Sequence, residues 1–463
     1  LEATVQAPVR AALRSIVGDA HYREADGDLV PFSRDATPLF TARPDAVVFP
    51  ADTREVSAVL ELATRHGVPV VPRGAGSNLC AATVALHGGI VLALTRLDRV
   101  LEIAPAELLA RVQPGVTSAA LADTAAQWGL LWAPDPGSRT VATIGGTIAT
   151  NAGGLRGLKY GVTRDYVLGL EAVLPTGEVI RTGGRLHKDV AGYDLTRLLT
   201  GSEGTLAVIT EATLALRPAP RTSGTGVAYF PDLAAAGSAV TAIISDGVLP
   251  ATLEFLDRPC IRAVEDFAGL GLRTDAGALL LFGDDGEPDA VTRALTRMSE
   301  ACAAHGALEV TTAAQVAEAE ALLAARRCAL PALSRLGALT ILEDATVPRP
   351  RIAEMVERID RIAERHDVTI ATFGHAGDGN LHPTCVIGSP DDTEAIARAE
   401  RAFGDIFATA IGLGGTITGE HGVGAAKFPY LAAQLGSAQV ALLRRVKEAF
   451  DPAGILNPGK LGS

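Results

Sequence analysis

The sequence predicts an α+β protein of two or three domains. Its 463 residues exceed the length over which a single hydrophobic core keeps growing. Residues 45–71 show strand, helix and strand patterns in succession, and a glycine-rich turn follows at once. After the linker around Pro218, strand-like runs alternate with alanine-rich helices, which is typical of an antiparallel sheet covered by helices. We therefore expect two differently built parts that meet near residue 219.

Composition excludes several classes of function. The net charge of -12 provides no basic surface for a nucleic-acid backbone, so no nucleic acid is expected as a partner. No apolar run reaches the roughly 18 residues of a membrane span. The five cysteines form no C-x-x-C pair, which indicates reduced thiols in a cytoplasmic protein and no iron–sulfur cluster. Peripheral membrane association, a homodimer and a removed N-terminal segment stay open.

The first part of the chain begins with a helical extension in residues 1–40, in which we find no chemistry. A strand is expected at Ala46–Pro50, and a capping box at Asp52–Glu55 starts a helix to His66. A second strand follows at Val68–Val71. This order places the next turn at the end of a strand.

That turn consists of small and polar residues that could form an anion cradle from backbone N–H groups. It could hold a pyrophosphate, but Leu79 occupies the third glycine position of the dinucleotide fingerprint, so the turn is not of that type. Taken alone, a strand-to-loop turn without a ligand is the simpler interpretation. Its residues are Arg73, Gly74, Ala75, Gly76, Ser77 and Asn78.

Two further segments are equally rich in small residues. They bury little apolar surface and let an extended ligand lie along bare backbone, although an exposed loop is the alternative. Ile144 and Ile148, and the strand-like run Val167–Leu174, favour a buried and ordered arrangement. The residues concerned are Pro136, Gly137, Ser138, Thr143, Gly145, Gly146, Thr147, Asn151, Gly153 and Gly154, then Glu203 and Gly204, with a strand through Ile209.

Together these ordered turns resemble the FAD-binding domain of the vanillyl-alcohol-oxidase flavoprotein superfamily. Within it the likeness is to the group of D-lactate dehydrogenases, glycolate oxidase flavin subunits and D-2-hydroxyglutarate dehydrogenases, over about residues 45–460. The resemblance implies two subdomains that grip the ADP part of FAD through the residues named above, with Asn457 near the flavin ring. Many relatives tether FAD through a histidine in the first turn. This sequence has Ala75, Gly76 and Ser77 there, so non-covalent FAD is expected.

The resemblance also implies a domain order. It comprises the N-terminal extension (1–40), the FAD-binding domain (41–219), a substrate or cap domain (220–424) and a C-terminal segment returning to the FAD domain (425–463). In the cap domain we expect strands at 225–230, 251–256, 278–282 and 307–311, and helices at 233–244, 288–305 and 313–329. A last helix is expected at 425–450.

Two histidines flank a glycine-rich turn in this second part. Asp378-Gly379 is a strong two-residue hairpin signal between the β-rich runs Val368–Phe373 and Leu381–Ile387. With that loop His375 faces His382, and the two rings could close on one metal ion. Two polar residues flanking a hairpin are the alternative.

The glycine-flanked pair Glu420-His421 supplies a third ligand by resemblance. In similar proteins Glu420 would join His375 and His382 on a divalent metal, while His421 stays outside the ligand set. Zn²⁺ suits two imidazoles and one carboxylate with open positions, and Mn²⁺ or Fe²⁺ is chemically admissible. A polar pair beside a flavin without metal is the alternative.

Arg326 lies in an Arg-x-x-x-x-Pro setting before Pro331. In relatives such an arginine binds the substrate carboxylate, whereas composition alone allows a cation near a helix C-terminus. The hydroxyglutarate enzymes carry a Thr four residues later and a Lys further on. This chain has Leu330 and no Lys near Leu342, which weighs against a second substrate carboxylate.

The resemblance therefore implies FAD-dependent oxidation of a small D-2-hydroxy acid, D-lactate first and glycolate second, to the 2-keto acid. Arg326 would hold the carboxylate, the metal would lower the hydroxyl pKa, His421 would take the proton, and the hydride would go to flavin N5. The electrons would pass to a quinone, a cytochrome, an iron–sulfur subunit or another carrier. Alternatives are a glycolate oxidase flavin subunit in a multi-subunit complex, a non-catalytic flavin subunit, and an alkyl-transfer synthase.

Overall fold

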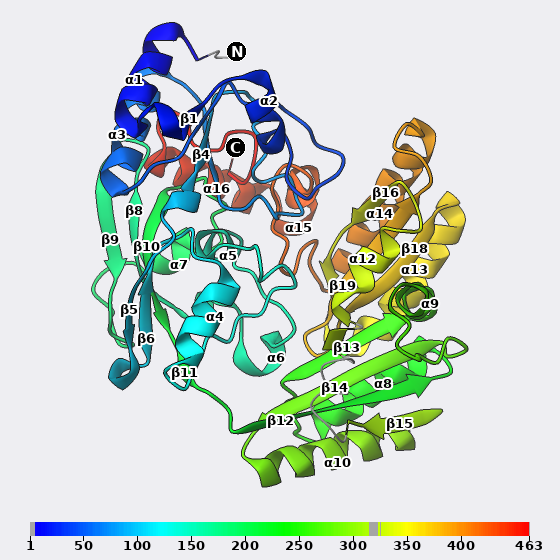
Figure 1. Ribbon diagram of the computed structural model, residues 1–463. Helices are drawn as coiled ribbons and strands as arrows, with labels where there is room; N and C mark the ends of the chain where they lie inside the picture. The colour runs from blue at the N-terminus through cyan, green and yellow to red at the C-terminus, as the bar shows by residue number, and fades with distance from the viewer. Residues whose placement is uncertain (1–4, 314–322, 325, 463) are drawn as a thin grey trace. The chain divides into compact units, whose positions relative to one another are not determined.

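The computed structural model describes residues 5–313, 323–324 and 326–462 (Figure 1). The chain divides into two compact units. The first comprises Leu1–Ala152, Val162–Ala219 and Glu420–Ser463, and the second comprises Gly153–Gly161 and Pro220–Gly419. The C-terminal segment from Glu420 onward therefore belongs to the same unit as the N-terminal strands.

In the first unit a four-stranded sheet has the order β1-β2-β4-β3. Its strands are β1 (Tyr22–Arg23), β2 (Ala46–Val48), β4 (Ile90–Ala93) and β3 (Val70–Arg73), and the last three run parallel. The predicted helix is α3 (Thr53–His66), which connects β2 to β3 and packs against α1 (Ala7–Val17). Asp52 caps it by accepting from the N–H groups of Arg54 and Glu55, and Gly67 ends it at φ +62°.

A second, antiparallel sheet of this unit has the order β5-β6-β10-β8-β9. Its strands are β5 (Val100–Ala104), β6 (Leu109–Val112), β10 (Val208–Ala215), β8 (Val167–Val173) and β9 (Val179–Gly183). Short helices α4 (Ser118–Ala126), α5 (Ile144–Thr150) and α7 (Leu195–Leu199) connect them. The small-residue segment after Thr143 is thus ordered and helical, with Ile144, Thr147 and Ile148 buried.

The prediction of one unbroken helix over residues 425–450 is wrong. The segment folds into a 3₁₀ turn (Phe428–Tyr430), α15 (Leu431–Leu435) and α16 (Ser437–Phe450). Gly436 separates the two helices at φ +77°, a conformation that costs glycine little and ends α15. Pro429 lies in the 3₁₀ turn, where its missing N–H is not needed.

The second unit is built on one large antiparallel sheet with the order β15-β12-β14-β13-β18-β19-β16, and β17 pairs with β19. Its strands are β12 (Thr222–Phe230), β13 (Thr252–Asp257), β14 (Ala278–Gly286), β15 (Glu309–Thr312), β16 (Leu339–Leu342), β17 (Ala345–Thr346), β18 (Thr369–His375) and β19 (Asn380–Ile387). The four strands expected between residues 225 and 311 are all present.

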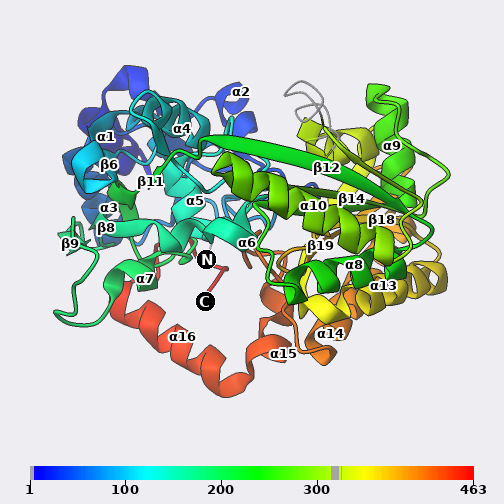
Figure 2. The same ribbon diagram turned by 90° about the horizontal axis from the view of Figure 1, so that it is seen from below.

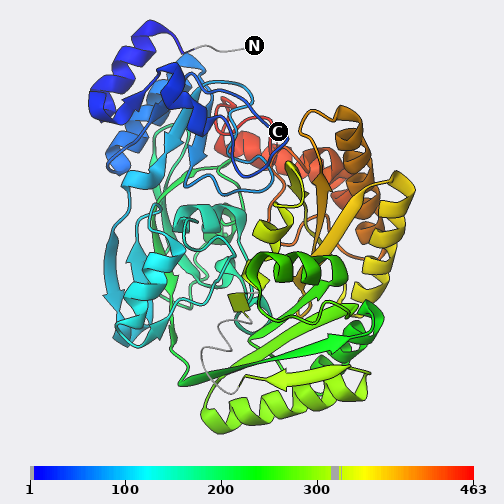
Figure 3. The same ribbon diagram turned by 45° about the vertical axis from the view of Figure 1, so that its right-hand side comes forward.

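Helices α10 (Pro288–Ala304), α8 (Leu233–Ser245), α13 (Ile352–His366) and α14 (Thr393–Gly412) contact one another in that order along the sheet (Figure 2). Helix α10 runs along the β12–β15 edge (Figure 3). Helices α9 (Arg258–Ala268) and α12 (Ala329–Leu333) contact each other. Most of the helix expected at 313–329 lies outside the described residues. Pro331 lies in the first turn of α12, where proline is tolerated.

A short piece of chain, Gly153–Gly161, also belongs to the second unit. It contains α6 (Gly157–Tyr160), whose Lys159 ammonium lies 2.6 Å from Asp284 Oδ1 and 2.8 Å from Asp285 Oδ1. Among the helices that the structure describes, none is long and apolar enough to cross a bilayer. All five cysteines carry free thiols, as predicted.

Candidate functional site

The two histidines lie on the predicted hairpin, but in a different register. His375 pairs with Asn380 and Phe373 pairs with His382, so the loop has four residues and His375 does not face His382. The N–H groups of Asp378 and Gly379 both donate to His375 O, at 3.3 and 3.0 Å, which makes Asp378-Gly379 the second half of a longer turn. Because the register shift is two residues, both imidazoles still lie on one face of the sheet.

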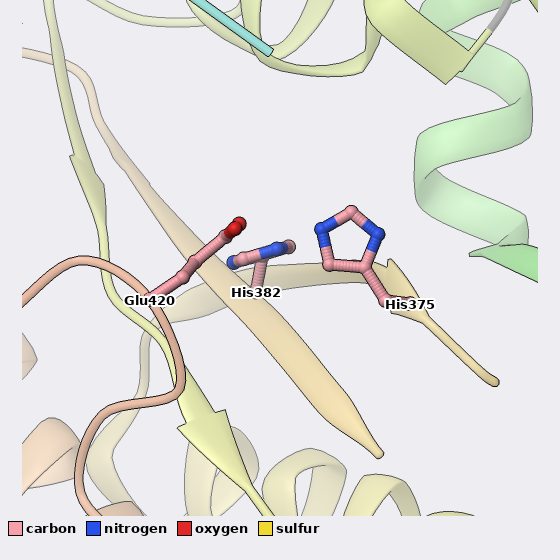
Figure 4. A group of neighbouring side chains, drawn as sticks. All are labelled: His375, His382 and Glu420. Carbon is pink, nitrogen blue, oxygen red and sulfur yellow. The ribbon is translucent and has the colours of Figure 1, made fainter. Parts of the chain in front are cut away.

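These two rings and Glu420 form a potential metal-binding group (Figure 4). One ligand atom from each side chain lies within 4.8 Å of the others, and the ring centroids of His375 and His382 are 5.1 Å apart. The three side chains point toward one another in Figure 4. Both histidines are buried. The donor set of two imidazoles and one carboxylate fits a divalent ion with open coordination positions.

Glu420 follows directly on Gly419, and the backbone before it is fixed by a buried acid. Asp344 accepts hydrogen bonds from Gly419 N at 2.7 Å and from Thr418 Oγ1 at 3.0 Å. A Cβ at position 419 would come 2.3 Å from Thr346 Oγ1 and 2.6 Å from the Asn380 carboxamide carbon. A glycine is therefore required at position 419 for the Glu420 backbone to lie this close to β19.

Glu254 on β13 is a site residue that the sequence analysis missed. It pairs with His375 across the strands, accepts from His375 Nδ1 at 2.7 Å and accepts from Arg326 Nε at 2.7 Å. Its side chain is 1% exposed. The available signal was an acid between the apolar residues Leu253 and Phe255 of a predicted strand, because an acid is almost never fully buried without a partner.

Arg326, the predicted carboxylate-binding residue, is buried beside the hairpin. Its guanidinium carbon lies 4.6 Å from the centre of the Phe373 ring, and Phe373 pairs with His382. The structure thus brings Arg326 to the same sheet face as the two histidines. Arg326 also forms an ion pair with the buried Glu254. The predicted alternative, a cation at a helix end, does not account for this contact.

His421 lies in a turn held by the first unit. Its carbonyl accepts from Asn78 Nδ2 at 3.3 Å and from Cys80 Sγ at 3.2 Å. The Glu203 carboxylate accepts from Val423 N at 2.6 Å and from Gly424 N at 2.7 Å. Burial raises the pKa of Glu203, and these two N–H groups oppose the shift.

The predicted FAD-binding turns of the first unit converge. A Cβ on Gly74 would lie 2.2 Å from Thr143 Oγ1, and a Cβ on Gly204 would lie 3.2 Å from Pro72 Cγ. Gly201 N donates to Ile148 O at 2.9 Å and Glu203 N donates to Ala149 O at 2.8 Å. Three segments far apart in the sequence therefore meet through their backbones, which is the close approach that an extended dinucleotide needs.

Several of the predicted cofactor residues make hydrogen bonds or packing contacts with the protein itself. Arg73 donates to Thr83 Oγ1 and Pro31 O beneath Gly76, and burial lowers its pKa. Asn457 donates to Ala82 O and Glu203 O and accepts from Lys460. Among the other contacts, Thr147 Oγ1 donates to Ile144 O, Arg164 N donates to Asn151 Oδ1 and Arg139 N donates to Pro136 O. A Cβ on Gly145 would meet Pro114, and Ile209 of β10 pairs with Ala172 of β8.

The remaining predicted residues are more open or lie on other segments. Ala75 is exposed, Ser77 is half-buried, and a Cβ on Gly137 would meet nothing within 4 Å. Gly146 N donates to Thr143 Oγ1, while Ser138 O accepts from Ala142 N. Gly153 and Gly154 begin the segment that belongs to the second unit.

Comparison with known sequences identifies the family. Residues 44–183 match a family described as FAD binding domain, and residues 219–461 match FAD linked oxidases, C-terminal domain. The chain belongs to the FAD-linked oxidase family. FAD is therefore its cofactor and the protein is an oxidoreductase, as the resemblance implied.

Named relatives agree with this assignment, and solved structures show the fold. The chain is 50% identical to glycolate oxidase subunit GlcD of Bacillus subtilis, over 98% of this chain and 96% of that protein. It is 36% identical to D-lactate dehydrogenase of Anaerostipes hadrus, over 97% and 95%. The structure of p-cresol methylhydroxylase aligns with a TM-score of 0.82 at 17% identity, covering 98% of this chain and 96% of that one. Alkyldihydroxyacetonephosphate synthase aligns with a TM-score of 0.79 at 20% identity, covering 98% and 86%. These two likenesses establish the vanillyl-alcohol-oxidase type of fold.

Proposed function

We propose that this FAD-linked oxidoreductase oxidises a small D-2-hydroxy acid, D-lactate first and glycolate second, to the 2-keto acid. The observation that carries the proposal is the group of His375, His382 and Glu420 in a chain of this family. Relatives named glycolate oxidase subunit and D-lactate dehydrogenase, at 50% and 36% identity, support a hydroxy acid as the substrate.

The chain offers sites for two groups. The converging turns around Gly74, Thr143 and Gly204 would hold FAD without a covalent bond, and His375, His382 and Glu420 would hold a divalent metal, Zn²⁺ first and Mn²⁺ or Fe²⁺ second. When bound, the flavin supplies a hydride acceptor at N5 and the metal supplies Lewis acidity toward the hydroxyl and carboxylate oxygens. We propose that the first unit holds the flavin, while His375, His382 and Arg326 of the second unit help to bind the metal and the substrate.

Arg326 is the residue proposed to bind the substrate carboxylate. Arginine suits this role because its guanidinium donates two parallel hydrogen bonds to a carboxylate. Arg326 is buried, so water competes little for those donors, and its contact with Phe373 limits how the plane can turn. These constraints orient the α-carbon of a bound hydroxy acid.

His421 is the residue proposed to take the hydroxyl proton. It directly follows Glu420, and its backbone is held by Asn78 and Cys80. An imidazole accepts a proton near neutral pH, which suits a general base for an alcohol. Glu420 would bind the metal, and the adjacent His421 would take the proton.

Two aliphatic residues favour a monocarboxylate substrate, because they stand where the resemblance would place a Thr and a Lys in the hydroxyglutarate enzymes. Leu330 lies in α12, and Leu342, which is 9% exposed, pairs with Thr384 two residues after His382. Neither can hold a second carboxylate. We therefore expect a short aliphatic substituent such as the methyl group of D-lactate, or the hydrogen of glycolate, to be accepted in preference to an acidic one.

The electrons must leave the reduced flavin for another carrier. The cysteines are scattered and lack the spacing of a cluster site. A quinone, a cytochrome or a separate iron–sulfur subunit would therefore serve as acceptor. Because one relative is named a subunit of glycolate oxidase, a flavin subunit within a larger complex is the second candidate.

A spectroscopic panel tests the proposed reaction. The purified flavoprotein is mixed anaerobically with D-lactate, L-lactate, glycolate, malate and D-2-hydroxyglutarate, and the flavin absorbance near 450 nm is followed. We expect bleaching by D-lactate or glycolate and little by the L-isomer or the dicarboxylates. A flavin that none of these acids bleaches would favour the non-catalytic subunit or the alkyl-transfer synthase.

A further inference from the structure

We propose that Glu254 is a positioning residue that couples the metal ligand His375 to the carboxylate-binding Arg326. The inference rests on the proposed function, because it assigns Glu254 a task at that same site. Its basis is a single buried carboxylate whose two oxygens contact two functional side chains from different elements.

The placement of Glu254 follows from the sheet. β13 lies beside β18, and Glu254 is directly opposite His375 in the antiparallel register. Directly opposed residues share one face with their Cβ atoms about 5 Å apart, so a short carboxylate reaches the ring. Oε1 accepts from His375 Nδ1 at 2.7 Å, and Oε2 accepts from Arg326 Nε at 2.7 Å.

The first contact selects one tautomer of His375. A carboxylate can only accept, so Nδ1 must carry the proton, which leaves the Nε2 lone pair for a metal ion. Metal-binding histidines commonly donate their other ring N–H to a carboxylate, and this partner orients the ring and makes the ligand more basic. Glu254 would thus prepare His375 before any ion arrives.

The second contact orients the guanidinium of Arg326. Since Nε donates to Glu254, a bidentate substrate carboxylate would use the edge formed by the two terminal nitrogens. The guanidinium also lies 4.6 Å from the Phe373 ring centre. The same acid would therefore fix both the metal ligand and the substrate anchor, so that their separation does not depend on two independent rotamers.

Burial makes this arrangement sensitive to substitution. The side chains of Glu254, His375 and Arg326 are 1%, 7% and 9% exposed. Removing one member of a buried pair leaves an uncompensated polar or charged group. Glu254→Gln keeps the shape but has one accepting oxygen, so its NH₂ group must face either His375 Nδ1–H or Arg326 Nε–H.

Asp257 provides a matched control on the same strand. It is 4% exposed, lies three residues after Glu254 and accepts from the backbone N–H groups of Cys260 and Thr372. Asp257→Asn therefore removes a buried acid of β13 whose hydrogen bonds, in the described part of the chain, go to Cys260 and Thr372 rather than to His375 or Arg326. Both substitutions should lower the stability of the protein, but only Glu254→Gln should change the metal affinity and the KM for the substrate.

The test is a metal titration of the chelator-treated flavoprotein. Zn²⁺ affinity is measured by competition with a chromogenic chelator, and the KM for D-lactate is measured after reloading. Glu254→Gln should weaken Zn²⁺ binding about 10- to 100-fold and raise KM, whereas Asp257→Asn should leave Zn²⁺ affinity within about twofold of wild type. Equal Zn²⁺ affinity for wild type and Glu254→Gln would overturn the inference while the proposed function stands. A wild type that binds no Zn²⁺, Mn²⁺ or Fe²⁺ would overturn both.

A second measurement uses the wild-type chain and does not depend on a variant that folds poorly. With ¹⁵N-labelled histidine, the NMR spectrum of the metal-free protein reports which ring nitrogen of each histidine carries the proton. We expect His375, assigned by its loss in His375→Gln, to be protonated at Nδ1 before metal is added. Protonation at Nε2 would contradict the positioning role.

Discussion

Two buried glutamates, Glu203 in the first unit and Glu254 in the second, hold functional residues in different ways. Glu203 accepts from two backbone N–H groups, of Val423 and Gly424, and so fixes the path of the chain after His421. Glu254 accepts from two side chains, and so fixes a tautomer and a guanidinium plane. Two glutamates that are similarly buried and accept the same number of hydrogen bonds can therefore have different roles. Glu203 holds the backbone of the first unit, and Glu254 orients side chains of the proposed site in the second unit.

The largest expected effect comes from the proposed metal ligands. His382→Ala and Glu420→Ala should each slow flavin reduction by D-lactate more than roughly a thousandfold, because a Lewis acid stabilises the transition state by several kcal/mol. The yellow colour should remain, since neither residue lies among the FAD-binding turns. Stopped-flow absorbance and metal analysis check both points. Unchanged reduction in either variant would remove the metal from the mechanism.

A third buried acid, Asp257, should make the free energy of unfolding depend on pH. Burial raises its pKa from an ordinary value of 3.8 to about 7. The native state then keeps a proton that the unfolded chain releases above pH 4. Stability from this group is therefore full below pH 4 and is lost as pH rises through 7, by roughly 4 kcal/mol.

Urea unfolding at several pH values between 5 and 7.5 measures that dependence. The difference in unfolding free energy between wild type and Asp257→Asn should fall as pH rises, because the amide does not titrate. A difference that stays constant with pH would show that Asp257 is ionised in the native state throughout this range.

His421→Asn tests whether Glu420 binds the metal while the adjacent His421 takes the hydroxyl proton. Removing a general base costs about 10²-fold or more, so flavin reduction should slow by about that factor. Metal content should stay at the wild-type level, because His421 is outside the proposed ligand set. If the variant loses its metal instead, His421 is a ligand and the division between Glu420 and His421 is wrong.

Glu203→Gln is expected to give the smallest of these effects, in stability rather than in chemistry. The amide has one accepting oxygen for two buried N–H groups, and an unsatisfied buried donor costs about 2 kcal/mol. The urea midpoint should fall accordingly. Zn²⁺ affinity should change less than in Glu254→Gln; a larger loss of affinity in Glu203→Gln would reverse the roles assigned to the two acids.

The sequence could predict features that depend on neighbouring residues, and it could not predict features that depend on contacts between distant residues. Strands and helices with clear periodicity, such as α3 with its Asp52 cap, and the family with its glycine turns, were predictable because these signals are local. The hairpin register was not, because Asp378-Gly379 fits both a two-residue loop and the end of a four-residue loop, and only tertiary contacts decide between them.

Glu254 escaped prediction for a related reason. Its partners lie 72 and 121 residues away, so no local motif connects them. Gly436 is the opposite case, because a glycine inside a helical pattern is a local signal that the helix can be interrupted there. Residues that lie in local motifs could be proposed from the sequence, whereas Glu254, whose contacts follow from the sheet register, required the structure.

The central claim is that His375, His382 and Glu420 bind a metal that the oxidation of D-2-hydroxy acids requires. The most direct measurement is the rate of anaerobic flavin bleaching by D-lactate after chelator treatment and after add-back of one metal at a time. We predict that chelation abolishes bleaching while the flavin stays bound, and that Zn²⁺, or else Mn²⁺ or Fe²⁺, restores it. Bleaching that proceeds at the same rate in metal-free protein would contradict the claim.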